Sequence, residues 1–192
     1  YRDLANDLAQ VIEAHGVCAD VVGHSMGGKA VMMLALTRPD LIRRAVIADI
    51  APVTYGHSQQ PMIDAMRAID LSAVATRGDA DRQLQAHVDD AGVRAFLLQS
   101  LDVKAQAWRL NLDVLSREMA KITGWPEGAF TPFAGDILFL SGGRSDYVRP
   151  EHRPAIKALF PNAKFAKIPQ AGHWLHADTP REFVESLKVF LG

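Results

Sequence analysis

Apolar positions at the start of the chain recur with the period of an amphipathic helix. Their spacing of three and four residues predicts a helix over residues 2–15, with Gly16 where helices commonly end. The pattern is already under way at Tyr1, with no initiator methionine, signal peptide or transit-like segment, so we expect the chain to be a fragment of a larger fold. The apolar positions are Leu4, Leu8, Val11 and Ile12.

Short apolar runs farther along the chain predict four buried strands. Helical patterns fall between or after them, over residues 27–37, 151–160 and 180–191. Because strands that alternate with helices form parallel sheets, we expect an α/β fold whose ligand site lies at the carboxyl ends of the strands. The runs are Val21–Val22, 45–48, 137–140 and 164–168.

Residues 53–125 interrupt this alternation. They carry helical patterns but no convincing parallel strand, and a stretch rich in proline and glycine at 124–132 then returns the chain to the sheet. We interpret residues 53–125 as a helical cap between two parts of a core, residues 1–52 and 126–192. The helical patterns cover residues 62–69, 80–89, 93–101 and 112–121.

The composition excludes several classes of protein. The 192 residues are 48% hydrophobic with a net charge of −1, and they show neither the basic excess of a nucleic-acid-binding protein nor an apolar run of membrane-spanning length. Cys18 is the only cysteine, which excludes internal disulfides and cysteine-based metal clusters. We expect Cys18 to be a small buried residue, and the protein to be cytoplasmic, without metal and without nucleic-acid or membrane partners.

The pentapeptide Gly23-His24-Ser25-Met26-Gly27 lies between a predicted strand and a predicted helix. A serine at such a sharp turn is exposed on a strained backbone, and we expect glycines beside it because side chains there would clash with the strand or the helix. The helix that follows directs its N-terminal N–H groups toward a developing oxyanion. We therefore predict that Ser25 is a nucleophile and that the backbone N–H of Met26 is one oxyanion donor.

A second motif, Gly172-His173-Trp174-Leu175-His176, follows the fourth predicted strand. A loop histidine at the carboxyl end of a strand, beside a glycine, suits a general base for Ser25, and we assign this role to His173. We expect His176 to pack or cap near the last helix. His24 is expected to point away from Ser25 and to support the turn or reach the pocket wall.

Three motifs together resemble the α/β-hydrolase superfamily, and more narrowly its small bacterial and mitochondrial esterases with a helical cap. The resemblance covers essentially the whole chain, with the motifs in the family's order and spacing. It implies an α/β-hydrolase fold of which this chain holds the C-terminal part, a mostly parallel sheet with an inserted helical cap. The motifs are Gly23-His24-Ser25-Met26-Gly27-Gly28, Asp49-Ile50-Ala51-Pro52 and Gly172-His173-Trp174-Leu175-His176.

A serine–histidine pair needs an acid to complete it, and the sequence offers two aspartates as candidates. Most relatives carry it in the pattern G-x-x-D-x-x-V; here Ser145 fills the aspartate slot and Asp146 falls one position late. Some hydrolases of this superfamily instead carry the acid at the end of the strand after the nucleophile, which here is Asp49. We favour Asp49, because an acid that follows four apolar strand residues is held rigidly at the catalytic edge, and Asp146 is the alternative. With Asp49 as the acid, Ser145 is placed to hydrogen-bond between Asp49 and His173.

The family also predicts parts that this sequence does not contain. In the family, the second oxyanion donor comes from a loop after an earlier strand, and the nucleophile strand lies between other strands. Without those strands, Val21–Val22 would form an exposed apolar edge. We therefore expect an N-terminal segment of about 60 residues, or a companion chain, to complete the sheet.

The resemblance implies a serine hydrolase that cleaves small carboxylic esters, with short acyl chains, through an acyl-enzyme and without a cofactor. Trp108 and Met66 are our candidates in the cap for lining a substrate pocket. A thioesterase acting on acyl-coenzyme A, or a C–C bond hydrolase, would use the same residues. A non-catalytic ligand-binding protein on this scaffold is the alternative of a different class, and the presence of both Ser25 and His173 argues against it.

Overall fold

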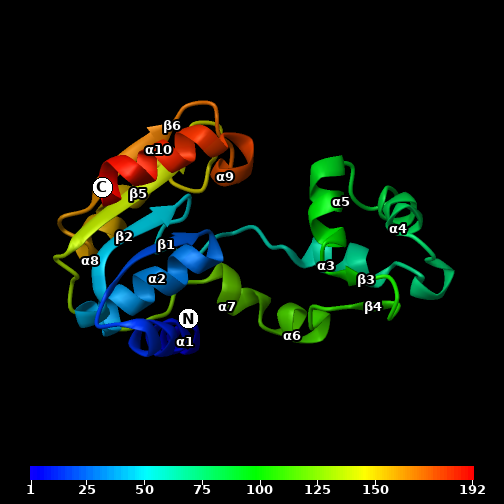
Figure 1. Ribbon diagram of the computed structural model, residues 1–192, viewed down its shortest axis with the longest axis horizontal. Coiled ribbons are helices and arrows are strands. Elements are labelled where there is room, and N and C mark those ends of the chain that lie inside the picture. Colours follow the sequence, from blue (N-terminus) through cyan, green and yellow to red (C-terminus); the bar gives the residue numbers. More distant parts are fainter. The chain divides into compact units, whose positions relative to one another are not determined.

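The computed structural model describes residues 1–192, which divide into two compact units. The core unit comprises Tyr1–Thr54 and Gly124–Gly192, and the inserted unit comprises Tyr55–Thr123. Each unit has its own cluster of buried apolar side chains. Figure 1 shows the core unit built around a sheet and the inserted unit built mainly from short helices.

A parallel sheet of four strands, in the order β1-β2-β5-β6, forms the centre of the core unit. Each strand contains one of the predicted apolar runs, and the predicted parallel α/β arrangement is confirmed. Because parallel strands end at the same edge, the residues that follow them are brought close together there. The strands are β1 (Ala19–His24), β2 (Ile42–Ala48), β5 (Asp136–Gly142) and β6 (Lys164–Ile168).

Side chains of the sheet alternate between its two faces. Val46 and Leu138 belong to a buried cluster against which the apolar side of α10 (Pro180–Leu191) packs. Phe139 points to the opposite face, where its ring lies 5.7 Å from the ring of Phe160. Coverage on both faces explains why the run 45–48 of β2 and the run 137–140 of β5 are apolar at every position rather than at alternate ones.

The remaining helices of the core unit lie close to the predicted positions. α1 (Arg2–His15) packs against α2 (Met26–Thr37), in which every residue from Gly28 to Leu36 is buried. The pattern predicted as one helix at 151–160 forms a 3-10 turn followed by an α-helix. The shorter elements are η1 (Pro39–Leu41), η3 (Pro150–His152), α8 (Arg153–Leu159) and α9 (Leu175–Asp178).

One edge of this sheet is open, because β1 pairs only with β2. Val22 of β1 is 41% exposed, and Val11 on the apolar side of α1 is 59% exposed. A groove of about 380 Å³ with largely apolar lining runs between α1, β1 and α2. The prediction of a buried strand at Val21–Val22 is therefore wrong for this chain, which has the apolar edge that we expected in the absence of further strands.

The inserted unit consists of short helices and one small hairpin. Its interior is a cluster of apolar side chains that includes Leu84 and Leu101, both fully buried. The Thr76 side chain accepts a hydrogen bond from the Asp79 backbone N–H, and Asp79 bonds back to Thr76, so the two residues form a capping box. The elements are α3 (Gln60–Arg67), η2 (Leu71–Ala73), α4 (Arg77–Leu84), α5 (Ala91–Leu98), β3 (Leu101–Asp102), β4 (Ala107–Trp108), α6 (Leu112–Arg117) and α7 (Met119–Thr123).

The ends of these helices differ from the predicted ones for local reasons. α4 begins before residue 80 because the Thr76 capping box starts it at Arg77. The pattern predicted as one helix at 112–121 is divided at Glu118 into α6 and α7. The antiparallel pair β3–β4 was not predicted, since two-residue strands are too short to produce a periodic pattern.

The side chain of Cys18 is exposed just before β1, so the prediction of a buried cysteine is wrong. Cys18 lies in the short connection between α1 and β1, outside both elements. None of the helices combines the length and the apolar composition required to cross a membrane.

Candidate active site

Ser25 forms the turn between β1 and α2. Its φ of 52° lies in the left-handed region that residues with a side chain rarely adopt, so this turn is strained. A Cβ at Gly23 would lie 2.5 Å from the carbonyl oxygen of Gly27. A Cβ at Gly28 would lie 2.6 Å from Cγ2 of Ile50. Without a side chain, Gly23 lets β1 approach α2 this closely, and Gly28 leaves room for the side chain of Ile50 after β2.

The predicted clash does not apply to Gly27. A Cβ built at Gly27 would have no atom within 4 Å, so this second glycine of the pentapeptide lies in open space. The steric reason for glycine therefore belongs to Gly23 and Gly28, and the expectation for Gly27 is wrong.

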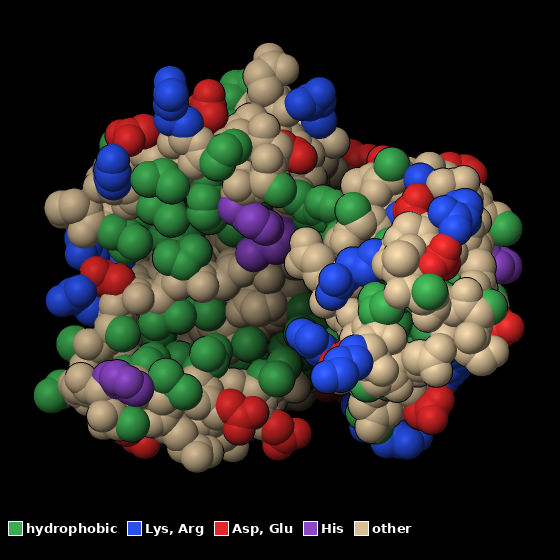
Figure 2. Space-filling model, turned by 45° about the vertical axis from the view of Figure 1, so that its right-hand side comes forward, with side chains coloured by type: hydrophobic (Ala, Val, Ile, Leu, Met, Phe, Trp, Pro, Cys, Tyr) green, Lys and Arg blue, Asp and Glu red, His purple; other side chains and the backbone are tan.

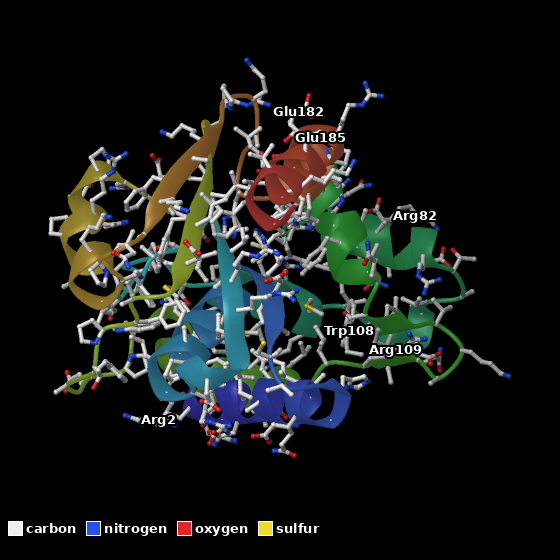
Figure 3. All side chains as sticks on the ribbon, turned by 60° about the vertical axis from the view of Figure 1, so that its left-hand side comes forward. Arg2, Arg82, Trp108, Arg109, Glu182 and Glu185 are labelled. Carbon is white, nitrogen blue, oxygen red and sulfur yellow. The ribbon has the colours of Figure 1, made fainter.

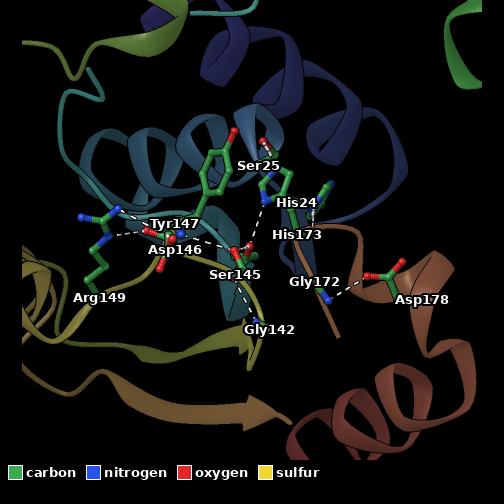
Figure 4. Close-up of polar contacts among 11 residues, drawn as sticks. His24, Ser25, Gly142, Ser145, Asp146, Tyr147, Arg149, Gly172, His173 and Asp178 are labelled. Atoms are coloured by element: carbon green, nitrogen blue, oxygen red, sulfur yellow. Dashed lines mark hydrogen bonds and ion pairs between the residues drawn. The ribbon is translucent and has the colours of Figure 1, made fainter. Parts of the chain in front are cut away.

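Ser25, His173 and Asp49 form a continuous hydrogen-bonded chain. Figure 4 labels Ser25 and His173 of this chain. Nε2 of His173 lies 3.0 Å from Oγ of Ser25, and Nδ1 lies 2.8 Å from Oδ2 of Asp49. Because a carboxylate oxygen only accepts, Nδ1 carries the proton that is donated to Asp49, which leaves Nε2 to accept from the Ser25 hydroxyl. The arrangement can therefore move a proton from Ser25 to His173.

Asp49 is completely buried directly after β2, and several donors satisfy its carboxylate. The Gly142 N–H donates to Oδ1 at 3.0 Å, whereas the Ser145 hydroxyl and His173 both donate to Oδ2. A buried carboxylate is costly without such partners, and these donors also fix the direction in which it faces His173. Asp49 also has a positive φ of 51°, so the backbone is strained on both sides of this proton relay, at Ser25 and at Asp49.

Asp146 lies outside this hydrogen-bonded chain. Its side chain is 89% exposed, and the nearest cationic group is Arg149, with 4.0 Å between Nη2 and Oδ2. The one-residue offset in the sequence therefore has a structural counterpart: Ser145 contacts Asp49, while the next residue turns toward solvent and Arg149 (Figure 4).

His24 supports the loop that carries His173. Its Nε2 donates to the backbone carbonyl of His173 at 2.7 Å, and burial lowers the pKa of its imidazole. The rings of His173 and His176 lie 4.8 and 4.9 Å from the ring of His24. Figure 2 shows histidine side chains gathered on the core unit among hydrophobic ones. His24 thus joins the residue before Ser25 to the backbone of His173.

Tyr147 was not identified from the sequence, yet its ring stacks on the imidazole of His173. The ring centroids are 3.7 Å apart and the ring planes are inclined by 17°. A residue in the loop after β5 produces no periodic pattern in the sequence. The one signal that could have indicated Tyr147 is its position two residues after Ser145.

Lys29 is a second residue that sequence reasoning missed. It is 1% exposed within α2, and its Nζ donates to the carbonyl oxygens of Val53 at 2.9 Å and Gly124 at 2.6 Å. Val53 comes shortly before the inserted unit in the chain and Gly124 directly after it. Burial lowers the pKa of Lys29 to about 8. Nothing in the apolar sequence of this helix indicated a buried cation.

Met26 occupies the first position of α2, directly after Ser25. The first N–H groups of a helix have no partner within the helix, so the Met26 N–H is available in principle to an oxyanion beside Ser25. Its role as a donor stays a prediction. No group of three or more histidine, cysteine or acidic side chains has the arrangement of a metal site.

The two residues predicted to line a substrate pocket contact each other inside the inserted unit. Trp108, which Figure 3 labels on β4, donates from Nε1 to the carbonyl oxygen of Met66 at 3.0 Å. Met66 is 2% exposed and packs with Ile63 and Leu112. These contacts show a packing role, and the pocket role stays a prediction.

Comparison with known proteins agrees with this fold. Residues 1–186 match the sequence model of the Alpha/beta hydrolase family. The chain belongs to the alpha/beta hydrolase family, as its three motifs indicated.

Two curated relatives and one solved structure illustrate the similarity. The sn-1-specific diacylglycerol lipase ABHD11 of Mus musculus is 42% identical over 200 residues, which cover 100% of this chain and 65% of the relative. Esterase YbfF of Escherichia coli (strain K12) is 36% identical over 193 residues, which cover 100% of this chain and 74% of the relative. The structure of a marine microorganism esterase has a TM-score of 0.92 at 35% identity and covers 97% of this chain and 75% of that one. The chain thus spans less than two thirds of the length of the mouse relative.

Proposed function

We propose that this chain carries the catalytic site of a serine hydrolase that cleaves carboxylic esters. The observation that carries the proposal is the hydrogen-bonded chain from Ser25 through His173 to the buried Asp49. Further support comes from the relatives, which are named as a diacylglycerol lipase and as esterases.

In the acylation half of the reaction, Oγ of Ser25 attacks the ester carbonyl carbon while Nε2 of His173 takes the hydroxyl proton. The carbonyl oxygen becomes an oxyanion, to which the Met26 N–H donates. When the tetrahedral intermediate breaks its bond to the alcohol oxygen, His173 returns the proton to that oxygen and the alcohol leaves. Ser25 is then esterified with the acyl group.

In the deacylation half, water replaces Ser25 as the nucleophile. His173 takes a proton from water as the water oxygen attacks the acyl carbon, and then gives the proton to Oγ of Ser25 as the acid is released. Throughout, Asp49 keeps the imidazole in one tautomer and stabilises the imidazolium that forms twice in each cycle. The reaction needs no cofactor.

We propose small esters with short acyl chains as the substrates. A thioester such as an acyl-coenzyme A, or a C–C bond beside a ketone, would engage the same residues. The relatives' names favour the ester. The pocket residues Trp108 and Met66 remain proposals for acyl selection.

This assignment is tested with the protein in a form in which the edge of β1 is paired, and with its Ser25→Ala variant, on p-nitrophenyl esters of two to ten acyl carbons and on the matching coenzyme A thioesters. The proposal expects the highest kcat/KM on short esters and a loss of at least about 10³-fold in the variant. Faster hydrolysis of the thioesters than of the esters would show that acyl thioesters are the substrate class. Equal activity of the variant would refute Ser25 as the nucleophile, and binding of esters without turnover would favour the non-catalytic alternative.

We further propose that a strand from an N-terminal segment or a companion chain pairs with the open edge of β1. The support is the apolar groove beside β1 and the exposure of Val22, since an uncovered apolar edge promotes aggregation. The 192-residue chain expressed alone should therefore aggregate or lack activity. A monomeric, active preparation of these residues would contradict this proposal without affecting the assignment of Ser25.

A further inference from the structure

The face of the His173 imidazole has a partner that the proton relay itself does not require. Tyr147 covers this face at 3.7 Å between ring centroids, with the planes nearly parallel at 17° (Figure 4). Tyr147 lies two positions after Ser145, so one short loop supplies both a hydroxyl to Asp49 and an aromatic ring to His173.

The hydrogen bonds of the relay do not hold the imidazole equally well through the whole reaction. Nδ1 keeps its contact with Asp49, but Nε2 loses its partner when Oγ of Ser25 is esterified. During that interval, His173 must direct Nε2 at water rather than at Ser25. One hydrogen bond leaves the ring free to tilt about it, whereas a stacked ring restricts that tilt.

The stacking of Tyr147 on His173 also affects the positive charge that the imidazole gains during the reaction. His173 becomes an imidazolium in both halves of the proposed reaction, and the face of an aromatic ring attracts a cation. This attraction acts on the protonated imidazole and not on the neutral one, so it favours the transition state over the resting enzyme.

We propose that Tyr147 is a positioning residue for His173, which fixes the plane of the imidazole during deacylation and stabilises the imidazolium through its ring face. This proposal rests on the proposed serine hydrolase function and adds a residue that the motifs did not indicate. The essential part is the ring rather than the hydroxyl.

Two substitutions separate this role from simple packing. Tyr147→Phe keeps the ring, and Tyr147→Leu fills much of the space with an apolar side chain but has no ring face. We expect kcat for a short p-nitrophenyl ester to stay within about twofold of wild type in the Phe variant and to fall about tenfold in the Leu variant. KM should stay within about twofold in both, because the ring acts on His173 and not on the bound ester.

A spectroscopic measurement tests the stack without relying on turnover. A tyrosine ring at this distance should shift the NMR resonances of the His173 ring protons upfield in the wild type and in the Phe variant, and not in the Leu variant. Wild-type resonances at ordinary positions would overturn the proposal even if the Leu variant did not fold.

The outcomes distinguish this proposal from the one on which it rests. A Leu variant as active as the wild type overturns the role of Tyr147 and leaves the hydrolase assignment intact. A wild type whose ester hydrolysis does not depend on Ser25 overturns the hydrolase assignment, and with it the role of Tyr147 in catalysis.

Discussion

Oδ2 of Asp49 lies 2.8 Å from Nδ1 of His173, although 124 positions separate the two residues in the chain. Asp49 directly follows β2, and His173 lies in the loop that follows β6, so the parallel sheet brings both to the carboxyl edge of its strands. Asp49 therefore occupies the place of the acid in the proposed relay, and Asp146 does not.

Replacing the acid by its amide tests this assignment. Asp49→Asn should lower kcat by about 10³–10⁴-fold, because the amide can donate to Nδ1 and would then stabilise the wrong imidazole tautomer. Asp146→Asn is the matched control, since its exposed carboxylate contacts only Arg149 among the cations, and its kcat should stay within about twofold. Equal losses in the two variants, or an active Asp49→Asn, would contradict the assignment.

Ser145 should contribute through Asp49. Ser145→Ala removes a hydroxyl that donates to the carboxylate oxygen also used by His173, and we expect kcat to fall about tenfold with little change in KM. Ser145→Thr retains a hydroxyl and should recover most of the activity. If Ala and Thr at this position behave alike, the hydrogen bond has no part in turnover.

The glycines around Ser25 should respond differently to the same substitution. Gly23→Ala places a Cβ 2.5 Å from the Gly27 carbonyl oxygen and should lower the free energy of unfolding by about 2 kcal/mol or more. Gly27→Ala meets no atom within 4 Å inside a helix and should be neutral or stabilising by up to about 1 kcal/mol. Chemical denaturation of both variants measures these changes in the free energy of unfolding. A Gly23→Ala variant as stable as the wild type would mean that β1 and α2 can move apart without a loss of stability.

Lys29 should make stability depend on pH. Burial lowers its pKa from 10.5 to about 8, so between these values the unfolded chain holds a proton that the folded chain has released. The free energy of unfolding should therefore rise as pH increases above about 8, by at most about 1.4 kcal/mol per pH unit.

Comparison with Lys29→Met isolates this contribution, because the variant has no titrating group at the same buried position. The measurement should stop near pH 10, since burial raises the pKa of Tyr1 to about 12 and its effect has the opposite sign above its ordinary value of 10.0. The difference in stability between wild type and variant should change with pH in this range. A constant difference would contradict a lowered pKa for Lys29.

The sequence alone predicted those residues whose chemistry and local sequence pattern indicate the same role. Ser25 and His173 each follow a strand in a glycine-containing motif, and the alternation of strands and helices predicted the parallel sheet that brings them together. The acid was harder to choose between Asp49 and Asp146, because the sequence does not show which of the two carboxylates reaches His173 in space.

Other features depend on three-dimensional contacts that leave no periodic signal. Tyr147 reaches His173 from a loop, and Lys29 meets carbonyl oxygens far from it in the sequence, at Val53 and Gly124. The clash expected at Gly27 occurs instead at Gly28, where a Cβ would meet the side chain of Ile50 after β2, a contact that no local sequence pattern shows.

Labelling with a fluorophosphonate, followed by mass spectrometry of the digested protein, tests the central claim most directly. The probe reacts with a serine whose hydroxyl is activated by a neighbouring base, so the account predicts a single adduct on Ser25 that is absent from Ser25→Ala and strongly reduced in His173→Ala. A folded protein that carries no adduct on Ser25, or an adduct that persists unchanged without His173, would contradict the claim that these residues form a nucleophile and its base.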